Sequence, residues 1–236
     1  MFYNYLNKSY QFILSNIPFI SFSKSKKSSK FNEVEKNYLK YIKYNNNFNN
    51  MGLELLLCFY LDYLIGIKII KFKHKIIKPT HILKDTIIWD NIDNSDIQKY
   101  EDNSNKWINF LDSYFKAEFK IQTSFVMKKS EIINLEIACP NATPFQFNIW
   151  KELLNVKHLS TYSEIASKIN NEKAVRAAGT AVSQNPIAIF IPCHRILPKT
   201  LINSNKNRNE FNEVGQYMHG SEFKKFLLNL EVNMQN

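Results

Sequence analysis

Cysteine is scarce in this sequence. Only Cys58, Cys139 and Cys193 occur among the 236 residues, and no two of them form a CxxC pair. An odd number at these spacings excludes a disulfide framework and gives no support for a four-ligand zinc site. His74 and His81 do not complete a metal-binding motif either. We therefore predict no metal, no cofactor and a chain that stays reduced inside a cell.

A hydrophobic run long enough to span a membrane is also missing. The early segment FILSNIPFISF is apolar, but it is interrupted and too short. We predict no membrane partner and an intracellular protein, cytoplasmic if the source is a bacterium and nuclear if it is a eukaryote. Organelle targeting by residues 1–30 is the alternative, although transit peptides usually carry arginine and this segment has none.

Arginine is nearly absent from a chain whose net charge is +10. Only Arg176, Arg195 and Arg208 occur among 31 basic residues, which indicates that an arginine here marks a place where a fixed planar guanidinium is needed. Residues 1–50 carry eight lysines against two glutamates, 51–140 are balanced, and 141–236 have an excess of four positive charges. We therefore expect a polyanionic partner at the two ends of the chain.

The chain divides into three predicted regions. Residues 1–50 lack glycine and are rich in Asn and Lys, which is typical of a poorly ordered extension. Residues 52–139 predict a small α/β domain: two β-rich runs form a hairpin parted by Asp62 and Tyr63, and a further strand covers 132–137. A helix behind the cap candidate Ser104 has one apolar face, made of Trp107, Phe110, Leu111, Tyr114 and Phe115.

Residues 143–232 predict a mostly helical second domain. Thr143 with Gln146, and Thr161 with Glu164, form capping boxes that each begin a helix, and a third helix runs from about Lys173 to Gln184. The last two helices, joined by a tight polar turn, are a helix-turn-helix of the winged-helix type. Together with the small sheet-plus-helix first domain, this mostly helical second domain gives the fold class α/β (α+β). The third helix has a small, apolar inward face of Val175, Ala178, Gly179 and Val182, and an outward face of Lys173, Arg176, Ala177, Thr180 and Gln184.

Cys193 follows an unbroken apolar run, 187–191, in the sequence IPCHRI. A reactive cysteine needs a nearby base or positive charge, and His194 and Arg195 are candidates by sequence, although neighbouring side chains in a strand point to opposite faces. A Cys-His pair alone is weak support, because most buried cysteines are structural.

The surrounding motifs change this balance. TPFQFNIW, TYSEIA, KAVRAAGTAV, NPIAIF, IPCHRI and GQYMHGSEFKKFLLNLE together resemble the O6-alkylguanine-DNA alkyltransferase family, also called methylated-DNA-protein-cysteine methyltransferases. The resemblance covers about 143–231 closely and 52–139 only in the order of elements. It implies DNA repair by direct transfer of an alkyl group from O6-methylguanine, and also from O4-methylthymine, to Cys193, once per molecule. The protein would act as a monomer on double-stranded DNA.

The same resemblance assigns roles to individual residues. His194 would act through a water as the base for Cys193, Glu231 would orient His194, and Asn185 would hold the turn before the active-site segment. The final helix agrees with the role of Glu231, because this residue lies at the margin of a stripe formed by Phe223, Phe226, Leu227 and Leu230 and can be half buried there.

The resemblance also implies a minor-groove interface that takes the target base out of the stack. Tyr162 would serve the flipped nucleotide, Arg176 would fill the gap it leaves, and small Ala177 and Gly179 would let the helix enter the groove. The remaining implied contacts are Ser163 and Asn171 to phosphates and Tyr217 and Met218 in the guanine pocket.

Two departures from the family pattern keep alternatives open. Met218, His219 and Gly220 stand where the family usually has Ser and two glycines, and a long Asn- and Lys-rich insertion occupies about 197–214. A non-catalytic lesion-binding relative and a helix-turn-helix regulator are the rival functions, and neither would acquire a covalent alkyl group. A Cys-His hydrolase is a poorer alternative, because no oxyanion hole can be named.

Overall fold

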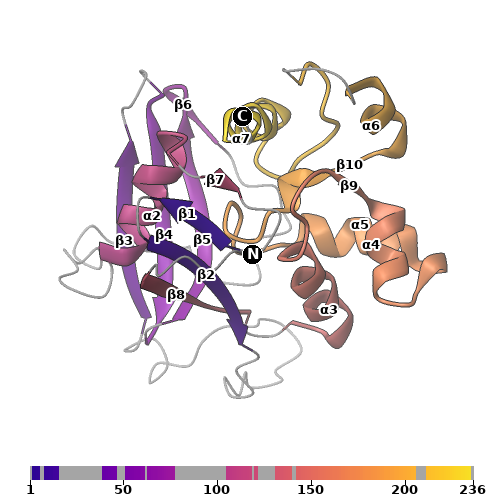
Figure 1. Cartoon of the computed structure of the whole chain (residues 1–236), viewed down its shortest axis with the longest axis horizontal. Coiled ribbons are helices and arrows are strands. Elements are labelled where there is room, and N and C mark those ends of the chain that lie inside the picture. The colour runs from indigo at the N-terminus through magenta and orange to yellow at the C-terminus, as the bar shows by residue number, and fades with distance from the viewer. Residues whose placement is uncertain are drawn as a thin grey trace.

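The computed structural model describes two parts, a sheet with one helix and a cluster of helices beside it (Figure 1). The described residues are 2–5, 8–15, 39–46, 51–61, 63–77, 105–118, 120–121, 131–139, 142–205 and 211–234. Within them, no helix is long and apolar enough to cross a membrane. The same described ranges contain no group of three or more His, Cys, Asp or Glu side chains that could hold a metal ion.

The sheet has the order β3-β4-β5-β8-β2-β1-β7, with β6 paired to β5. Strand β8 is parallel to β2 and to β5, and the other pairs are antiparallel. Its strands are β1 Phe2–Tyr5, β2 Lys8–Ser15, β3 Leu39–Asn46, β4 Leu53–Tyr60, β5 Tyr63–Phe72, β6 Lys75–Ile76, β7 Lys120–Ile121 and β8 Glu131–Ala138.

The predicted hairpin, helix and further strand of this part are confirmed. Strands β4 and β5 pair antiparallel around Leu61, which turns the chain with a φ of +53°. Of the two residues predicted to part the strands, Tyr63 is instead the first residue of β5 and pairs with Tyr60, and Asp62 lies outside the described residues. Helix α2 covers Asn105–Phe115 and buries its predicted apolar face. Ser104, the cap candidate, lies outside the described residues. Strand β8 contains the predicted segment 132–137.

The prediction of a poorly ordered extension over 1–50 is wrong for β1, β2 and β3. In β3 the side chains of Ile42 and Tyr44 are buried in the core while Lys43 and Asn45 are exposed, which is the alternation of a half-buried strand. Averaging the composition over fifty residues hid this short pattern among the surrounding lysines and asparagines. The apolar segment suggested as a targeting peptide falls partly in β2 and partly outside the described residues.

The helical part is built from the predicted capping boxes. Thr143 caps α3, Pro144–Leu153, and Thr161 caps α4, Tyr162–Lys168, each with the reciprocal side-chain bonds of a capping box. A 3-10 turn η3, Glu172–Ala174, leads into α5, Val175–Ser183, which completes the predicted helix-turn-helix. The remaining elements are β9 Ser160–Thr161, η4 Cys193–Arg195, β10 Ile196–Leu197, α6 Lys199–Asn205 and α7 Ser221–Asn233. Helix α6 lies inside the predicted insertion, 197–214, whose residues 206–210 are outside the described ranges.

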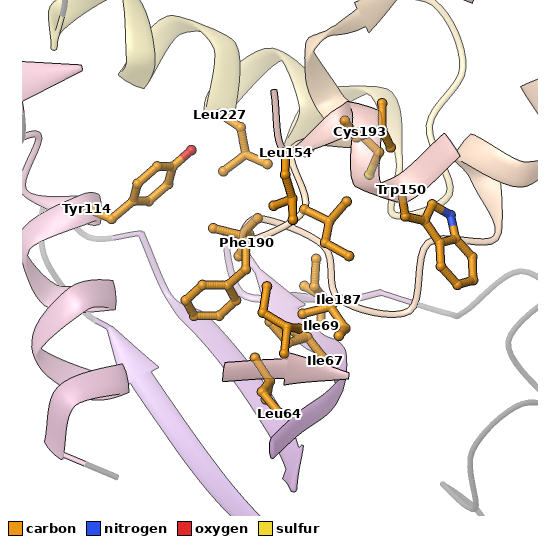
Figure 2. Close-up of a cluster of buried hydrophobic side chains, with 14 of the residues drawn as sticks. Leu64, Ile67, Ile69, Tyr114, Trp150, Leu154, Ile187, Phe190, Cys193 and Leu227 are labelled. Atoms are coloured by element: carbon orange, nitrogen blue, oxygen red, sulfur yellow. The ribbon is translucent and has the colours of Figure 1, made fainter. Parts of the chain in front are cut away.

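The apolar run 187–191 forms a turn and not a strand. The backbone N–H of Ile191 donates to the carbonyl of Ile187 over 2.9 Å, and Ile189 takes a φ of +75°. This turn is buried against the sheet part, because Phe190 meets the ring of Trp107 at 5.1 Å and that of Phe110 at 5.2 Å. The core therefore continues from β5 and α2 through this turn to α3 and α7 (Figure 2).

Candidate active site

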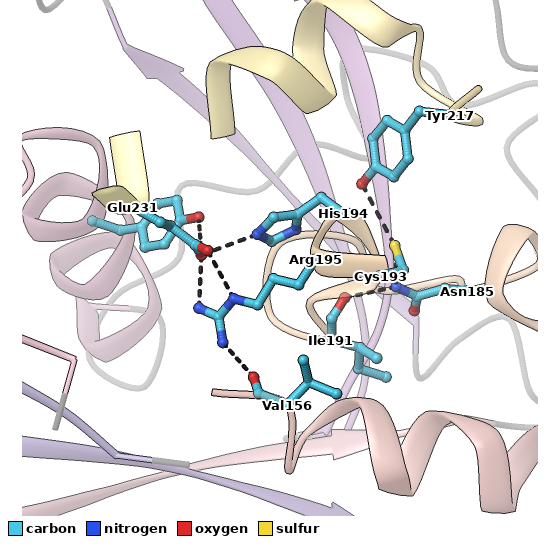
Figure 3. A network of polar contacts seen from close by, with 9 residues as sticks. Val156, Asn185, Ile191, Cys193, His194, Arg195, Tyr217 and Glu231 are labelled. Carbon is cyan, nitrogen blue, oxygen red and sulfur yellow. Dashed lines mark hydrogen bonds and ion pairs between the residues drawn. The ribbon is translucent and has the colours of Figure 1, made fainter. Parts of the chain in front are cut away.

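Cys193 is the first residue of the 3-10 turn η4, shortly after the turn 187–191, and it is only 2% exposed. Two side chains reach its sulfur. The amide Nδ2 of Asn185 donates to Sγ over 3.0 Å, and the hydroxyl of Tyr217 lies 3.5 Å from it (Figure 3). The structure thus brings together three predicted site residues from the segment after α5, η4 and the loop before α7.

The environment of Cys193 differs from that of the other two cysteines. Burial raises the pKa of all three thiols. At Cys193 this effect is opposed by hydrogen bonds from Tyr217 and Asn185 and by the charge of Lys224, whereas at Cys139 nothing opposes it and at Cys58 only a hydrogen bond from Tyr41 does. The pKa of Cys193 stays above its usual value because burial is the largest effect, but Cys193 is the cysteine at which the most groups act to stabilise a thiolate, the nucleophilic form.

Asn185 is fully buried and joins the sulfur to the turn. Its Nδ2 also donates to the carbonyl of Ile191 over 2.8 Å, and its Oδ1 accepts the backbone N–H of Ile187 over 3.0 Å. Each end of the amide thus holds one end of the turn that contains the positive-φ residue Ile189. The position of Cys193 depends on the same side chain that donates to its sulfur.

Glu231, on α7, is a buried carboxylate with four donors. Its Oε1 accepts from His194 Nε2 at 3.0 Å and from Arg195 Nη2 at 2.7 Å, and its Oε2 accepts from Arg195 Nε at 2.7 Å (Figure 3). The fourth donor is the hydroxyl of Tyr114, 2.8 Å from Oε1. Glu231 is 3% exposed, so it is more deeply buried than the half-buried position predicted from the sequence.

Charge and tautomer follow from these contacts. Burial would raise the pKa of Glu231, but the charge of Arg195 and the hydrogen bonds from Arg195 and His194 outweigh it and hold the pKa well below its usual range. Burial lowers the pKa of His194, against the opposite effect of Glu231, so the imidazole is neutral at neutral pH. A carboxylate only accepts, so His194 carries its proton on Nε2 and presents a lone pair on Nδ1. No protein donor in the described part of the chain bonds to that Nδ1.

Arg195, named from the sequence as a possible charge beside the thiol, has a different position. Its guanidinium is buried on Glu231 and also donates through Nη1 to the carbonyl of Val156 over 2.7 Å. The cation that acts on Cys193 is Lys224, on α7, which is 1% exposed and donates from Nζ to the carbonyl of Ile196 over 2.7 Å. Burial lowers the pKa of Lys224 to about 8.

Sequence reasoning missed Lys224 and Tyr114 as site residues. In the sequence, Lys224 is only one of the residues of the family-like segment GQYMHGSEFKKFLLNLE, and Tyr114 is only part of a predicted apolar helix face. A signal was present for Tyr114, since a buried tyrosine hydroxyl usually needs a hydrogen-bond partner. Its partner, 117 residues away, could not be read from local spacing.

Comparison with known proteins places this arrangement in a family. Residues 144–233 match the family model described as 6-O-methylguanine DNA methyltransferase, DNA binding domain. The chain is 35% identical over 131 residues to a methylated-DNA–protein-cysteine methyltransferase of Methanosarcina mazei, a match that covers 55% of this chain and 75% of that protein. The chain belongs to the methylated-DNA–protein-cysteine methyltransferase family.

A second family member, from Haemophilus influenzae, is 47% identical over 123 residues. That match covers 51% of this chain and 56% of the Haemophilus methyltransferase, so the chain matches little more than half the length of that relative. The crystal structure of Mycobacterium tuberculosis OGT in complex with DNA superposes with a TM-score of 0.52 and 24% identity, over 83% of this chain and 94% of that one. This likeness confirms the predicted fold class.

The residues that the family resemblance implies for contact with the duplex lie on α4, on α5 and in the turn between them. Arg176 and Ala177 are exposed on α5, and Ser163 and Asn171 are exposed at the starts of α4 and η3. Gly179 lies under the ring of Tyr162, because a Cβ added to it would be 3.7 Å from that ring. The predicted outward position of Gln184 is wrong: this side chain is half-buried and accepts from Gln146 over 2.7 Å, since α5 ends there against α3.

Tyr162 is electrostatically coupled to Cys193. Burial raises the pKa of the Tyr162 phenol, and the charge of Cys193 raises it further. The phenol of Tyr162 therefore stays protonated at neutral pH. It can act as a hydrogen-bond donor toward a group held between the two residues.

Met218 and His219 are both buried in the loop before α7, at 7% and 2% exposure. The ring of His219 meets that of Tyr217 edge-on at 5.5 Å, and burial lowers the pKa of His219 to about 4, so this histidine is neutral. The His219 side chain therefore fills space beside the ring of Tyr217, at one of the positions that depart from the family pattern.

Proposed function

We propose that this chain repairs alkylated DNA by transferring the alkyl group of O6-methylguanine, and of O4-methylthymine, to Sγ of Cys193. The observation that carries the proposal is the environment of that sulfur, which has a cation, two hydrogen-bond donors and a neighbouring His194–Glu231 pair. Membership of the family supports the same conclusion. Residues 143–232 would form the alkyltransferase unit, and residues 52–139 would support it.

The proposed reaction balances without a cofactor. The thiol of Cys193 loses its proton toward Nδ1 of His194 through a bridging water, and the thiolate attacks the methyl carbon. A carbon–sulfur bond forms as the bond between the methyl carbon and O6 breaks, and its electron pair goes to the guanine, which takes up one proton. A thioether is not a leaving group at neutral pH, so each molecule reacts once.

Tyr162 and helix α5 would bring the modified base out of the duplex and present it to Cys193. A base inside a duplex must be extruded before its O6 can reach a buried sulfur, at a cost of about a few kcal/mol of stacking. Arg176, exposed on α5, would fill the resulting gap, and the phenol of Tyr162 would donate to the flipped guanine. Ser163 and Asn171 would contact phosphates, and Tyr217 and Met218 would line the pocket.

The test is incubation with a duplex that contains one O6-methylguanine, followed by mass spectrometry of the digested protein. The peptide containing Cys193 should gain about 14 Da, once per molecule and without turnover. Cys193→Ala should abolish the gain and keep DNA binding. Lesion binding without any mass gain would instead favour the non-catalytic relative, and repeated turnover would contradict the proposal.

A further inference from the structure

Tyr114 places a hydroxyl from the sheet part of the molecule on the carboxylate of Glu231. The tyrosine lies on α2, has no exposed surface, and donates to Oε1 over 2.8 Å. Its ring is fixed between Phe110, stacked at 5.9 Å, and Phe115, edge-on at 5.4 Å. The hydroxyl is therefore held rigidly at the end of α7, far along the sequence from every other donor to this carboxylate.

Oε1, the oxygen that Tyr114 contacts, also accepts the hydrogen bond from Nε2 of His194. Arg195 already fixes the orientation of the carboxylate by bonding to both oxygens. Tyr114 is therefore not needed to fix the orientation of the Glu231 carboxylate. What Tyr114 adds is a donor that draws on the negative charge of Oε1, and that charge stabilises the protonated form of the neighbouring imidazole.

We propose that Tyr114 is a positioning residue for the alkyl transfer, whose hydroxyl acts through Glu231 to limit how readily His194 takes up a proton. This inference rests on the proposed function of His194 as the base for Cys193. It gives the sheet part of the chain an indirect role in the chemistry of the helical part, through Glu231.

The charged and titratable groups around His194 set the direction of the effect. They are Glu231 and Lys224 from α7, Arg195 and Cys193 from η4, and Tyr114 from α2. Burial lowers the pKa of His194, Glu231 raises it, and Arg195 and Lys224 lower it. Removal of the Tyr114 hydroxyl leaves both cations in place and concentrates more negative charge on Oε1. The pKa of His194 should rise in response.

Tyr114→Phe tests this, because it deletes one hydroxyl and keeps the ring. The matched control is Tyr44→Phe, which removes another buried tyrosine hydroxyl that donates to Asp112, also on α2, over 2.8 Å. The single-turnover rate of transfer from an O6-methylguanine duplex is measured against pH for both variants and the wild type. Thermal melting confirms that each variant is folded.

In Tyr114→Phe, the midpoint of the acid limb should move up by about half to one pH unit. Transfer would then be about three-fold to ten-fold slower below the midpoint and changed by less than about two-fold on the alkaline side. The profile of Tyr44→Phe should follow that of the wild type. A uniform loss at every pH would show that Tyr114 only supports the fold, and that result, like an unchanged profile, would overturn the inference.

A second readout does not require transfer. The His194 imidazole is titrated by NMR, with its resonance assigned by comparison with His194→Gln, and its midpoint should be higher in Tyr114→Phe than in the wild type. A protein with a monofluorinated tyrosine at position 114, a stronger donor that preserves the packing, should show the opposite shift. Unchanged midpoints overturn the inference, whereas a wild type that transfers nothing overturns the proposed function and leaves this coupling measurable.

Discussion

Asn185 donates its side-chain N–H to the sulfur of Cys193 over 3.0 Å while the same amide closes the buried turn around Ile189. A β-branched residue at a positive φ, here +75°, is rare and costs on the order of 1 to 3 kcal/mol, so the turn needs partners that hold it. Position and reactivity of the thiol therefore depend on one side chain.

Asn185→Ala should reduce both stability and transfer. It leaves the N–H of Ile187 buried without its partner, at a cost of about 1 to 3 kcal/mol, and it removes one of the two hydrogen bonds that the carbonyl of Ile191 accepts. It also removes a donor that stabilises the thiolate. We expect a clear loss in urea unfolding and a transfer rate lower by about ten-fold or more. The control is Asn155→Ala, which changes an exposed asparagine in the turn after α3. Unchanged unfolding in Asn185→Ala would contradict this account of the turn.

Lys224→Met should change the pH dependence of transfer. Burial lowers the pKa of Lys224 to about 8, so the amine is mostly charged at pH 7 and mostly neutral at pH 9, and its support for the Cys193 thiolate is lost as the pH rises through about 8. The variant should be slower by about ten-fold near pH 7 and should approach the wild type near pH 9.

The control for this prediction is Lys225→Met, which removes a half-buried lysine from the same helix. Its rate should follow the wild type across the pH range. An equal deficit of Lys224→Met at pH 7 and pH 9 would show that the amine acts through its bond to the carbonyl of Ile196 and not through its charge.

The elements that the sequence predicted correctly depend on short-range chemistry. A capping box joins residues three apart, as in Thr143 with Gln146, so its signal lies within one turn of helix. The β4–β5 hairpin is similarly local. The position of Cys193 beside His194 came from the sequence order of one motif.

Long-range contacts and rare backbone angles could not be predicted in this way. Nothing in the sequence near Tyr114 or Arg195 indicates that both donate to Glu231, because those contacts exist only after α2, η4 and α7 pack together. The run 187–191 has the composition of a buried strand, and the unusual φ of Ile189 has no local signal such as glycine. Strand β3 was missed because the bias toward Asn and Lys masks its alternation.

Arg176→Ala should separate recognition from chemistry. The side chain is exposed on α5, and in the proposed reaction it fills the gap that the flipped base leaves in the duplex. Its loss should therefore slow reaction with a paired lesion by about ten-fold or more and leave reaction with the free modified base unchanged. Lys173→Ala, an exposed lysine in η3, should weaken duplex binding mainly at low salt, as expected for a phosphate contact. Equal losses of Arg176→Ala on duplex and free base would contradict the proposed gap-filling role.

The buried pair Met218 and His219 should restrict the alkyl groups that reach Cys193. His219 is 2% exposed, and its ring lies edge-on to that of Tyr217. The hydroxyl of Tyr217 is 3.5 Å from the sulfur, so only Tyr217 connects the His219 ring to the reacting atom. Met is flexible and can move aside for a methyl group, but a benzyl group needs space that the histidine ring occupies.

Overpacking of this kind costs about 1 to 3 kcal/mol, which in a transition state corresponds to roughly ten-fold to hundred-fold in rate. We therefore expect the wild type to react much faster with O6-methylguanine in DNA than with free O6-benzylguanine, and His219→Gly to narrow that difference by raising the benzyl rate. The two rates are measured side by side with His158→Gly as the control, since His158 is exposed and remote from the loop before α7 in sequence. If the wild type accepts the benzyl compound as readily as His219→Gly does, the histidine does not border the alkyl pocket and its burial serves only the packing of that loop.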